Sequence, residues 1–101
     1  MTITASTESG SRIRLSVPAP TWEGYEEIGT GIYRKAIYVS PRAKRCVVET
    51  YSIWQDRHTG GCVGTQYMLV EDDSMLAMLA EEYADVADAL EKAGMIVAEE
   101  L

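Results

Sequence analysis

The chain of 101 residues has little of what metalloproteins, secreted proteins and membrane proteins require. It contains one histidine and two cysteines, few side chains for a metal site that needs about four ligands. No apolar run approaches the length of a transmembrane helix, and the N-terminal MTITASTESGSR lacks the charged-then-apolar order of a secretion signal. Only three prolines interrupt a composition that is 47% hydrophobic, which favours a folded chain. We expect a cytoplasmic protein without cofactor or metal.

Positive charge is also scarce, and its distribution is uneven. The formal net charge is -7, from 16 acidic and nine basic residues. Residues 71–101 carry ten acids and one base, near -9, whereas residues 1–70 carry six acids and eight bases, near +2. A field of this sign repels nucleic-acid phosphates and attracts basic surfaces. We expect a protein partner with a basic surface and no direct contact with nucleic acid or membrane, although a merely solvated acidic helix is the simpler alternative.

The strongest periodic signal covers residues 74–93 and predicts one amphipathic helix. Apolar residues recur on one side at helical spacing: Leu76, Leu79, Ala80, Tyr83, Val86, Ala87 and Leu90. Asp73 or Ser74 is placed to cap the first turn, and Gly94 is placed to adopt the left-handed conformation after the last turn. We expect this helix to pack on a sheet through its apolar side.

Segments rich in valine, isoleucine, tyrosine and threonine predict a three-stranded antiparallel meander before the helix, over residues 32–39, 45–54 and 62–70. Pairing the last two strands with Trp54 opposite Cys62 places Glu49 opposite Tyr67 and Ile53 opposite Val63. Apolar residues then lie on both faces of the sheet. One helix covers one face, so the N-terminal segment with Trp22 or another chain, such as a second copy in a homodimer, must cover the other.

The rest of the chain gives weaker signals. Residues 1–11 resemble a mobile tail, residues 12–17 alternate as a short edge strand, and residues 18–31 read as a loop. Trp22 in that loop is either a lid over the core or a binding anchor. Residues 95–98 are apolar enough for a last short strand. We therefore expect a tail followed by one α+β domain over residues 12–101, an antiparallel meander of three to five strands packed against one long C-terminal amphipathic helix.

Two features within the predicted strands have structural interpretations. Glu49 lies mid-strand on the face assigned to the helix, and Lys35 or Arg34 on the neighbouring strand is its expected partner in a structural ion pair. Cys46 and Cys62 lie at opposite ends of adjacent strands, about eight residue steps or roughly 26 Å apart. They are expected to be reduced thiols in the core or at its rim.

The loop at residues 55–62 holds the nearest approach to a catalytic cluster: Asp56, Arg57, His58, Thr59 and Cys62. It offers at most three metal ligands, and no oxyanion pocket can be assigned to it. A solvated loop is the simpler interpretation, so we expect no enzyme, with a small ligand-binding or catalytic domain as the alternative.

A basic cluster with nearby tyrosines surrounds the first turn of the meander: Arg34, Lys35, Arg42, Lys44 and Arg45, with Tyr33, Tyr38 and Tyr51. It could stack a single-stranded nucleic acid, but the net charge opposes this. Protection of the sheet edge against aggregation explains these bases more simply.

The predicted binding surface lies on the polar side of the helix. It consists of Met78, Glu81, Glu82, Asp85 and Asp88, which we call the acidic ridge. A methionine beside carboxylates suits contact with a surface that has basic and apolar parts. The leading hypothesis is an inhibitor of phage or mobile-element origin, of the anti-CRISPR type, that covers a nucleic-acid-binding surface. An antitoxin or immunity protein is the alternative of the same type.

Overall fold

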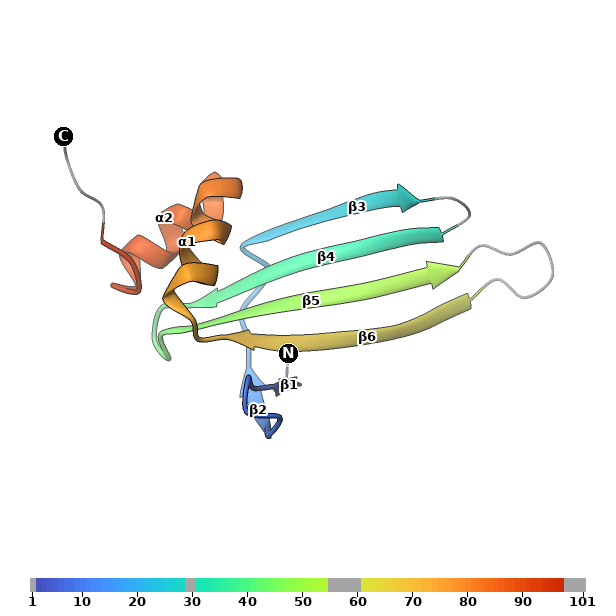
Figure 1. Cartoon of the computed structure of the whole chain (residues 1–101), viewed down its shortest axis with the longest axis horizontal. Helices are drawn as coiled ribbons and strands as arrows, with labels where there is room; N and C mark the ends of the chain where they lie inside the picture. Colours follow the sequence, from blue (N-terminus) through green and yellow to red (C-terminus); the bar gives the residue numbers. More distant parts are fainter. Residues whose placement is uncertain (1, 29–30, 55–60, 98–101) are drawn as a thin grey trace.

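The structure is a computed structural model and describes residues 2–28, 31–54 and 61–97. These residues form an α+β fold with one mixed sheet of six strands and two helices. The elements are β1 Thr2–Ser6, β2 Arg12–Ser16, β3 Trp22–Ile28, β4 Gly31–Ser40, β5 Arg45–Trp54, β6 Gly61–Val70, α1 Asp73–Glu82 and α2 Ala84–Lys92. Both helices lie over one end of the long strands β3 to β6 (Figure 1). The strand order is β2-β1-β6-β5-β4-β3.

The predicted meander corresponds to β4, β5 and β6, which pair antiparallel in sequence order. Glu49 lies opposite Tyr67, as predicted. Beyond Ser52 the register shifts, so that Ile53 pairs with Cys62 rather than with Val63. The sheet as a whole is not purely antiparallel, because β1 runs parallel to β6 where they meet.

The single helix predicted over residues 74–93 is wrong in one respect, because the chain breaks it at Tyr83. Tyr83 has extended backbone angles, φ -125° and ψ 109°, and separates α1 from α2. Its ring packs on Trp22 of β3, with centroids 4.3 Å apart. Neither glycine nor proline marks this break, so the packing of an aromatic side chain overrides local helix propensity. Asp72, rather than Asp73 or Ser74, caps α1 by accepting a hydrogen bond from the Ser74 backbone N–H.

The apolar stripe of the helix is confirmed despite the break. Leu76 and Leu79 of α1 and Val86 and Leu90 of α2 are all buried. They pack on one side of the sheet, which we call the helix face, together with Ile37, Val39, Cys46 and Val70. Trp22 packs against the same cluster, as expected for a lid over the core.

The opposite side of the sheet is covered by the N-terminal hairpin β1–β2, and we call it the hairpin face. Ile3 and Ala5 of β1 are buried there with Val17, Tyr38, Val47 and Leu69. Residues 1–11 were predicted as a mobile tail, but residues 2–6 form a strand paired with β2. The tail prediction failed because a five-residue strand with two small or branched apolar residues gives little periodic signal.

Two other predictions also differ from the structure. The expected loop at residues 18–31 contains β3, which pairs along its whole length with β4. The described part of the expected last strand, residues 95–97, is not a strand. Gly94 does adopt the predicted positive φ, at 71°, and the backbone N–H of Met95 donates to the carbonyl of Leu90. Met95 and Ile96 then fold back against the helix-face cluster.

Candidate protein-binding surface

The five residues of the acidic ridge are divided between the two helices. Met78, Glu81 and Glu82 belong to α1, whereas Asp85 and Asp88 belong to α2, and all five are exposed. The extended backbone at Tyr83 separates the two groups, so they do not follow one continuous helical side as the sequence predicted. The ridge is therefore a surface formed by two helices rather than by one.

Most carboxylates of this region have no cation to neutralise them within the described residues. Glu71 lies 3.5 Å from Arg45, an ion pair in which both side chains are about half exposed. Asp72 is used as the α1 cap. The remaining acids of the described segment 71–97 make no ion pair with a described residue: Asp73, Glu81, Glu82, Asp85, Asp88 and Glu91. Their charge is therefore available to a partner.

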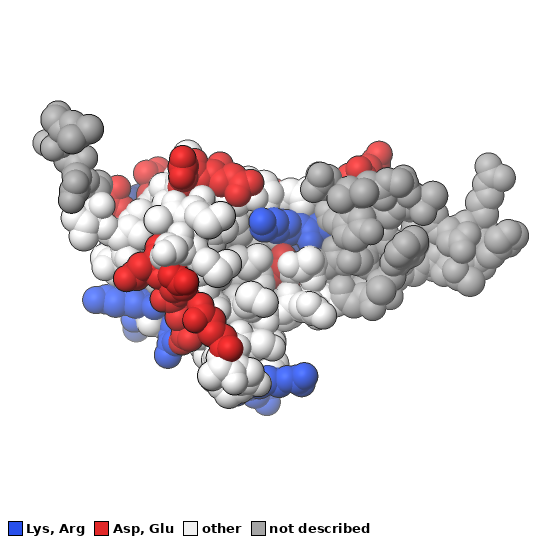
Figure 2. Space-filling model, in the orientation of Figure 1, with Lys and Arg blue, Asp and Glu red and all other residues white. Residues whose placement is uncertain are grey.

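The acidic side chains gather in two areas of the face seen in Figure 2. One band crosses the surface over the beginning of α1, and the other follows the upper edge over its far end. White, uncharged surface lies between them. Met75 and Met78 of α1 are 42% and 65% exposed, so apolar side chains accompany the carboxylates. This mixture suits contact with a basic protein surface that also has apolar patches.

The position of the helices depends on the contact between Trp22 and Tyr83. The Trp22 ring lies over Gly24, where a Cβ would come within 2.7 Å of the indole. Gly24 thus leaves the space that Trp22 needs to reach Tyr83. The Lys35 ammonium also contacts Tyr83, at 5.5 Å from the centroid of its ring, a cation–π distance. These contacts fix the junction of α1 and α2 on the sheet.

A buried charge network lies on the hairpin face. Glu49, 3% exposed, lies 3.2 Å from the Arg34 guanidinium and accepts a hydrogen bond from the Tyr38 hydroxyl at 3.3 Å. Arg34 also donates to Glu23 at 2.8 Å. The structural ion pair predicted for Glu49 is therefore present with Arg34, although on the face opposite the helices. Burial, with Glu49 nearby, raises the pKa of Tyr38 and raises that of Tyr67 to about 12.

A shallow depression of about 620 Å³ lies over this network, lined on one side by residues 17–20 and on the other by the charged and tyrosine side chains. The carboxylate of Glu49 already has its hydrogen-bond donors within the chain. The Arg34 Nε is buried without a described acceptor, but the same guanidinium pairs with Glu23 and Glu49. We interpret this network as a structural support for the hairpin face.

Two members of the basic cluster predicted from the sequence do not lie on one surface. Arg34 and Lys35 are neighbours in β4 and therefore point to opposite faces of the sheet. Arg34 contacts Glu49 on the hairpin face, and Lys35 contacts Tyr83 on the helix face. Tyr38, one of the tyrosines expected to stack bases, is 2% exposed. Arg34 and Lys35 therefore do not share one surface, and the Tyr38 ring is not accessible to stack a base.

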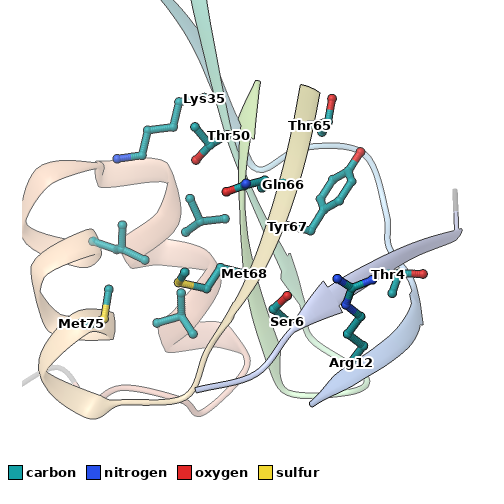
Figure 3. Close-up of a pocket in the computed structure, with 13 residues that line it drawn as sticks. Thr4, Ser6, Arg12, Lys35, Thr50, Thr65, Gln66, Tyr67, Met68 and Met75 are labelled. Carbon is teal, nitrogen blue, oxygen red and sulfur yellow. The ribbon is translucent and has the colours of Figure 1, made fainter. Parts of the chain in front are cut away.

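A groove of about 480 Å³ runs beside β6 and was not predicted (Figure 3). Gln66, Met68 and Met75 line it toward the helices, and Tyr67 and Arg12 line it toward the hairpin. No spacing in the sequence indicates this groove, because its walls come from β1, β2, β4, β5, β6 and α1, which only the fold brings together.

The cysteines do not form a shared site. Cys46 is a buried free thiol whose pKa burial raises to about 11, so the reactive thiolate is suppressed. It pairs with Val70 at one end of the β5–β6 ladder, whereas Cys62 pairs with Ile53 near the other end. The loop with His58, at residues 55–60, lies outside the described residues. Within the described ranges no group of three or more histidine, cysteine or acidic side chains is arranged to hold a metal.

Comparisons of the chain with protein-family models, curated proteins and solved structures find no match. Neither helix of the described chain has the length and apolar character needed to cross a membrane.

Proposed function

We propose that the protein is a small non-enzymatic inhibitor that binds another protein through the acidic ridge and covers a basic surface of that partner. The observation that supports this most strongly is the exposed negative charge on α1 and α2. Six acids there have no described counter-ion, and residues 71–101 carry a charge near -9, from ten acids and one base. Charge of one sign concentrated on one part of a molecule speeds association with a surface of the opposite sign.

The apolar residues next to these acids supply the other half of the contact. Met75 and Met78 are exposed on the same helix as Glu81 and Glu82. Methionine adapts its shape to irregular surfaces, so it adds buried apolar area to the contact. Carboxylates alone would mainly speed the approach of the partner. We infer a contact in which carboxylates pair with arginine or lysine at the rim and methionine packs nearer the centre.

A basic surface that binds carboxylates in this way commonly binds phosphates in its own function. The inhibitor would then act by competition, because the same cations cannot serve both ligands. The concrete form of the proposal is an anti-defence protein of a phage or mobile element, of the anti-CRISPR type, whose target is a host nuclease.

The experiment is affinity capture from the native host with three forms of the protein, followed by mass spectrometry. The ridge variant is Glu81→Lys with Asp85→Lys, one substitution on each helix. The matched control is Glu8→Lys with Glu27→Lys, two exposed acids outside the helices. Both pairs change the net charge from -7 to -3, since each substitution adds two units.

The proposal expects one protein that the wild type and the control capture and the ridge variant loses. Adding the wild type should release nucleic acid from that protein in a gel-shift assay. Equal capture by all three forms would show that the acidic ridge is not the binding surface. Capture without any effect on nucleic-acid binding would show that the protein does not compete with nucleic acid.

A further inference from the structure

The edge strand β3 and the side of β6 that faces away from β5 differ in how they are protected from pairing with another strand. The β3 edge carries three acids, Glu23, Glu26 and Glu27. The β6 sequence, GCVGTQYMLV, contains no charged residue and no proline. Natural sheets usually protect an exposed edge with charge, proline, a bulge or a covering segment. The outer side of β6 therefore lacks two of these protections, charge and proline.

The outer edge of β6 is also mostly unpaired within the described chain. β1 pairs with it at one register position, Ser6 opposite Met68, at the last residue of β1 (Figure 3). The β6 residues before Met68 pair only with β5 among the described residues. Because alternate residues of a strand direct N–H and C=O groups to each side, this edge presents free hydrogen-bonding groups beside Thr65, Gln66 and Tyr67.

The groove described above lies along this edge and has two chemically different sides. Toward the helices it is bounded by Met68, which is 54% exposed, and by Met75. Toward the hairpin, Figure 3 shows Thr4 and Arg12 near Tyr67. A strand added to β6 would direct its side chains alternately to these two sides. The apolar side would receive every second residue, and the side with Arg12 would receive the others.

The charge of the groove is opposite to that of the protein as a whole. Its lining includes two bases, Arg12 and Lys35, and no acid. Lys35 already lies over the Tyr83 ring, whereas Arg12 makes no ion pair with a described residue. In a chain of net charge -7, an unpaired arginine at this position favours an acidic side chain of the occupant.

We propose that the outer edge of β6 binds an extended segment of another protein as an added strand, in which apolar residues alternate with acidic ones. The backbone of the segment would pair with β6 at residues 65–67, its apolar side chains would pack on Met68 and Met75, and an acidic side chain would pair with Arg12. This mode of binding is the addition of a strand to an exposed sheet edge. The groove shares Met75 with the surface around the acidic ridge, but the ridge takes a partner surface of the opposite charge.

A peptide fits this groove better than a nucleic acid does. Two bases are too few to offset the repulsion of phosphates by the rest of the chain. The only described aromatic side chain that lines the groove is Tyr67, which is half-buried in the hairpin-face cluster and offers no stacking platform. A strand edge provides alternating donors and acceptors, which a peptide backbone matches residue by residue.

The test uses a fluorescein-labelled heptapeptide in which valine alternates with threonine and glutamate, titrated against the full chain by fluorescence anisotropy. The proposal expects a Kd below about 1 mM, since short strand ligands gain few contacts. The same peptide with lysine in place of glutamate should bind at least about tenfold more weakly. A version with N-methylated backbone amides should also lose at least about tenfold, because it cannot complete the ladder. Amide hydrogen exchange at residues 65–68 should slow when the first peptide binds.

The protein variants are Arg12→Glu and, as the matched control, Arg14→Glu. Both arginines are exposed in β2, but only Arg12 lines the groove. Arg12→Glu should raise the Kd of the glutamate peptide at least about tenfold, and Arg14→Glu should change that Kd by less than about twofold. Absence of binding at 1 mM, equal binding of the N-methylated peptide, or tighter binding of a thymidine oligonucleotide would overturn the proposal.

Discussion

The helix face and the hairpin face of the sheet are both buried, but by different means. The helix face is covered by α1 and α2, which follow β6 directly in the chain and contribute four buried apolar side chains. The hairpin face is covered by β1 and β2 from the opposite end of the chain, and it includes the charged Glu49 among its buried residues. One face is closed by apolar packing alone, and the other by packing around an ion pair.

This difference predicts different responses to mutation. A charge introduced into the buried cluster of the helix face lies among apolar side chains, which makes its burial costly. The charge already present on the hairpin face is tolerated because Arg34 and Tyr38 surround it.

Leu79→Asp should unfold the domain. The substitution removes a buried leucine, which alone costs about 2–5 kcal/mol, and places an unpaired carboxylate in the apolar cluster. The total approaches the whole stability of a typical domain, about 5–15 kcal/mol. Far-UV circular dichroism should show loss of structure at 25 °C. Ala77→Asp, on the exposed side of the same helix, should stay folded, and equal loss in both variants would contradict the assigned helix orientation.

Glu49→Ala should destabilise the hairpin face by about 2–4 kcal/mol, because Arg34 and Tyr38 lose their buried acceptor. The cost is below that of a fully buried ion pair, since Arg34 retains Glu23 and is partly exposed. Urea unfolding measures the change. Glu49→Gln keeps an acceptor of the same size and should cost less. Equal stability of Glu49→Ala and the wild type would show that the network does not support this face.

High pH should destabilise the protein through the hairpin face. Tyr67 stays protonated in the folded protein up to a pKa of about 12, chiefly because of its burial, and the pKa of Tyr38 is also raised. In the unfolded chain both titrate near 10, so between pH 10 and about 12 the unfolded state gives up protons that the folded state keeps. Stability is therefore intact below pH 10 and falls across that interval. Urea midpoints at about pH 9 and 11.5 measure this fall, and Tyr67→Phe should make the fall smaller. The same pH dependence in Tyr67→Phe and the wild type would show that Tyr67 does not cause the fall.

Asp72→Ala should lower the free energy of unfolding by about 1 kcal/mol, because the carboxylate caps the Ser74 backbone N–H at the start of α1. Thermal unfolding measures this change. The neighbouring Asp73 side chain makes no cap contact, so Asp73→Ala should lower the free energy of unfolding less. A larger loss of stability in Asp73→Ala than in Asp72→Ala would show that Asp73 is the cap.

The sequence was sufficient for the parts of the fold that depend on local periodicity. The apolar stripe from Leu76 to Leu90, the three central strands and most of the β5–β6 register are present as predicted. The break at Tyr83 was missed because it depends on Trp22, 61 residues earlier in the chain. β1 and β3 were missed because each is short or rich in acidic residues and becomes a strand through its pairing partner.

The candidate site was predictable only in part for the same reason. Exposure of the acidic ridge follows from the position of its residues on the polar side of the helices. Its division between two helices follows from the Tyr83 break, which local sequence does not indicate. The groove beside β6 combines residues as distant as Thr4 and Leu79, and no spacing rule connects them.

The most direct test of the proposed function is the salt dependence of Kd for the captured partner, measured for the wild type, the ridge variant and the matched control between 50 and about 200 mM salt. We predict that binding by the wild type and by the control weakens in parallel as salt rises. The ridge variant should bind at least about tenfold more weakly at low salt, and its Kd should depend less steeply on salt. A ridge variant that matches the control in affinity and slope would contradict the claim that the acids of α1 and α2 form the binding surface.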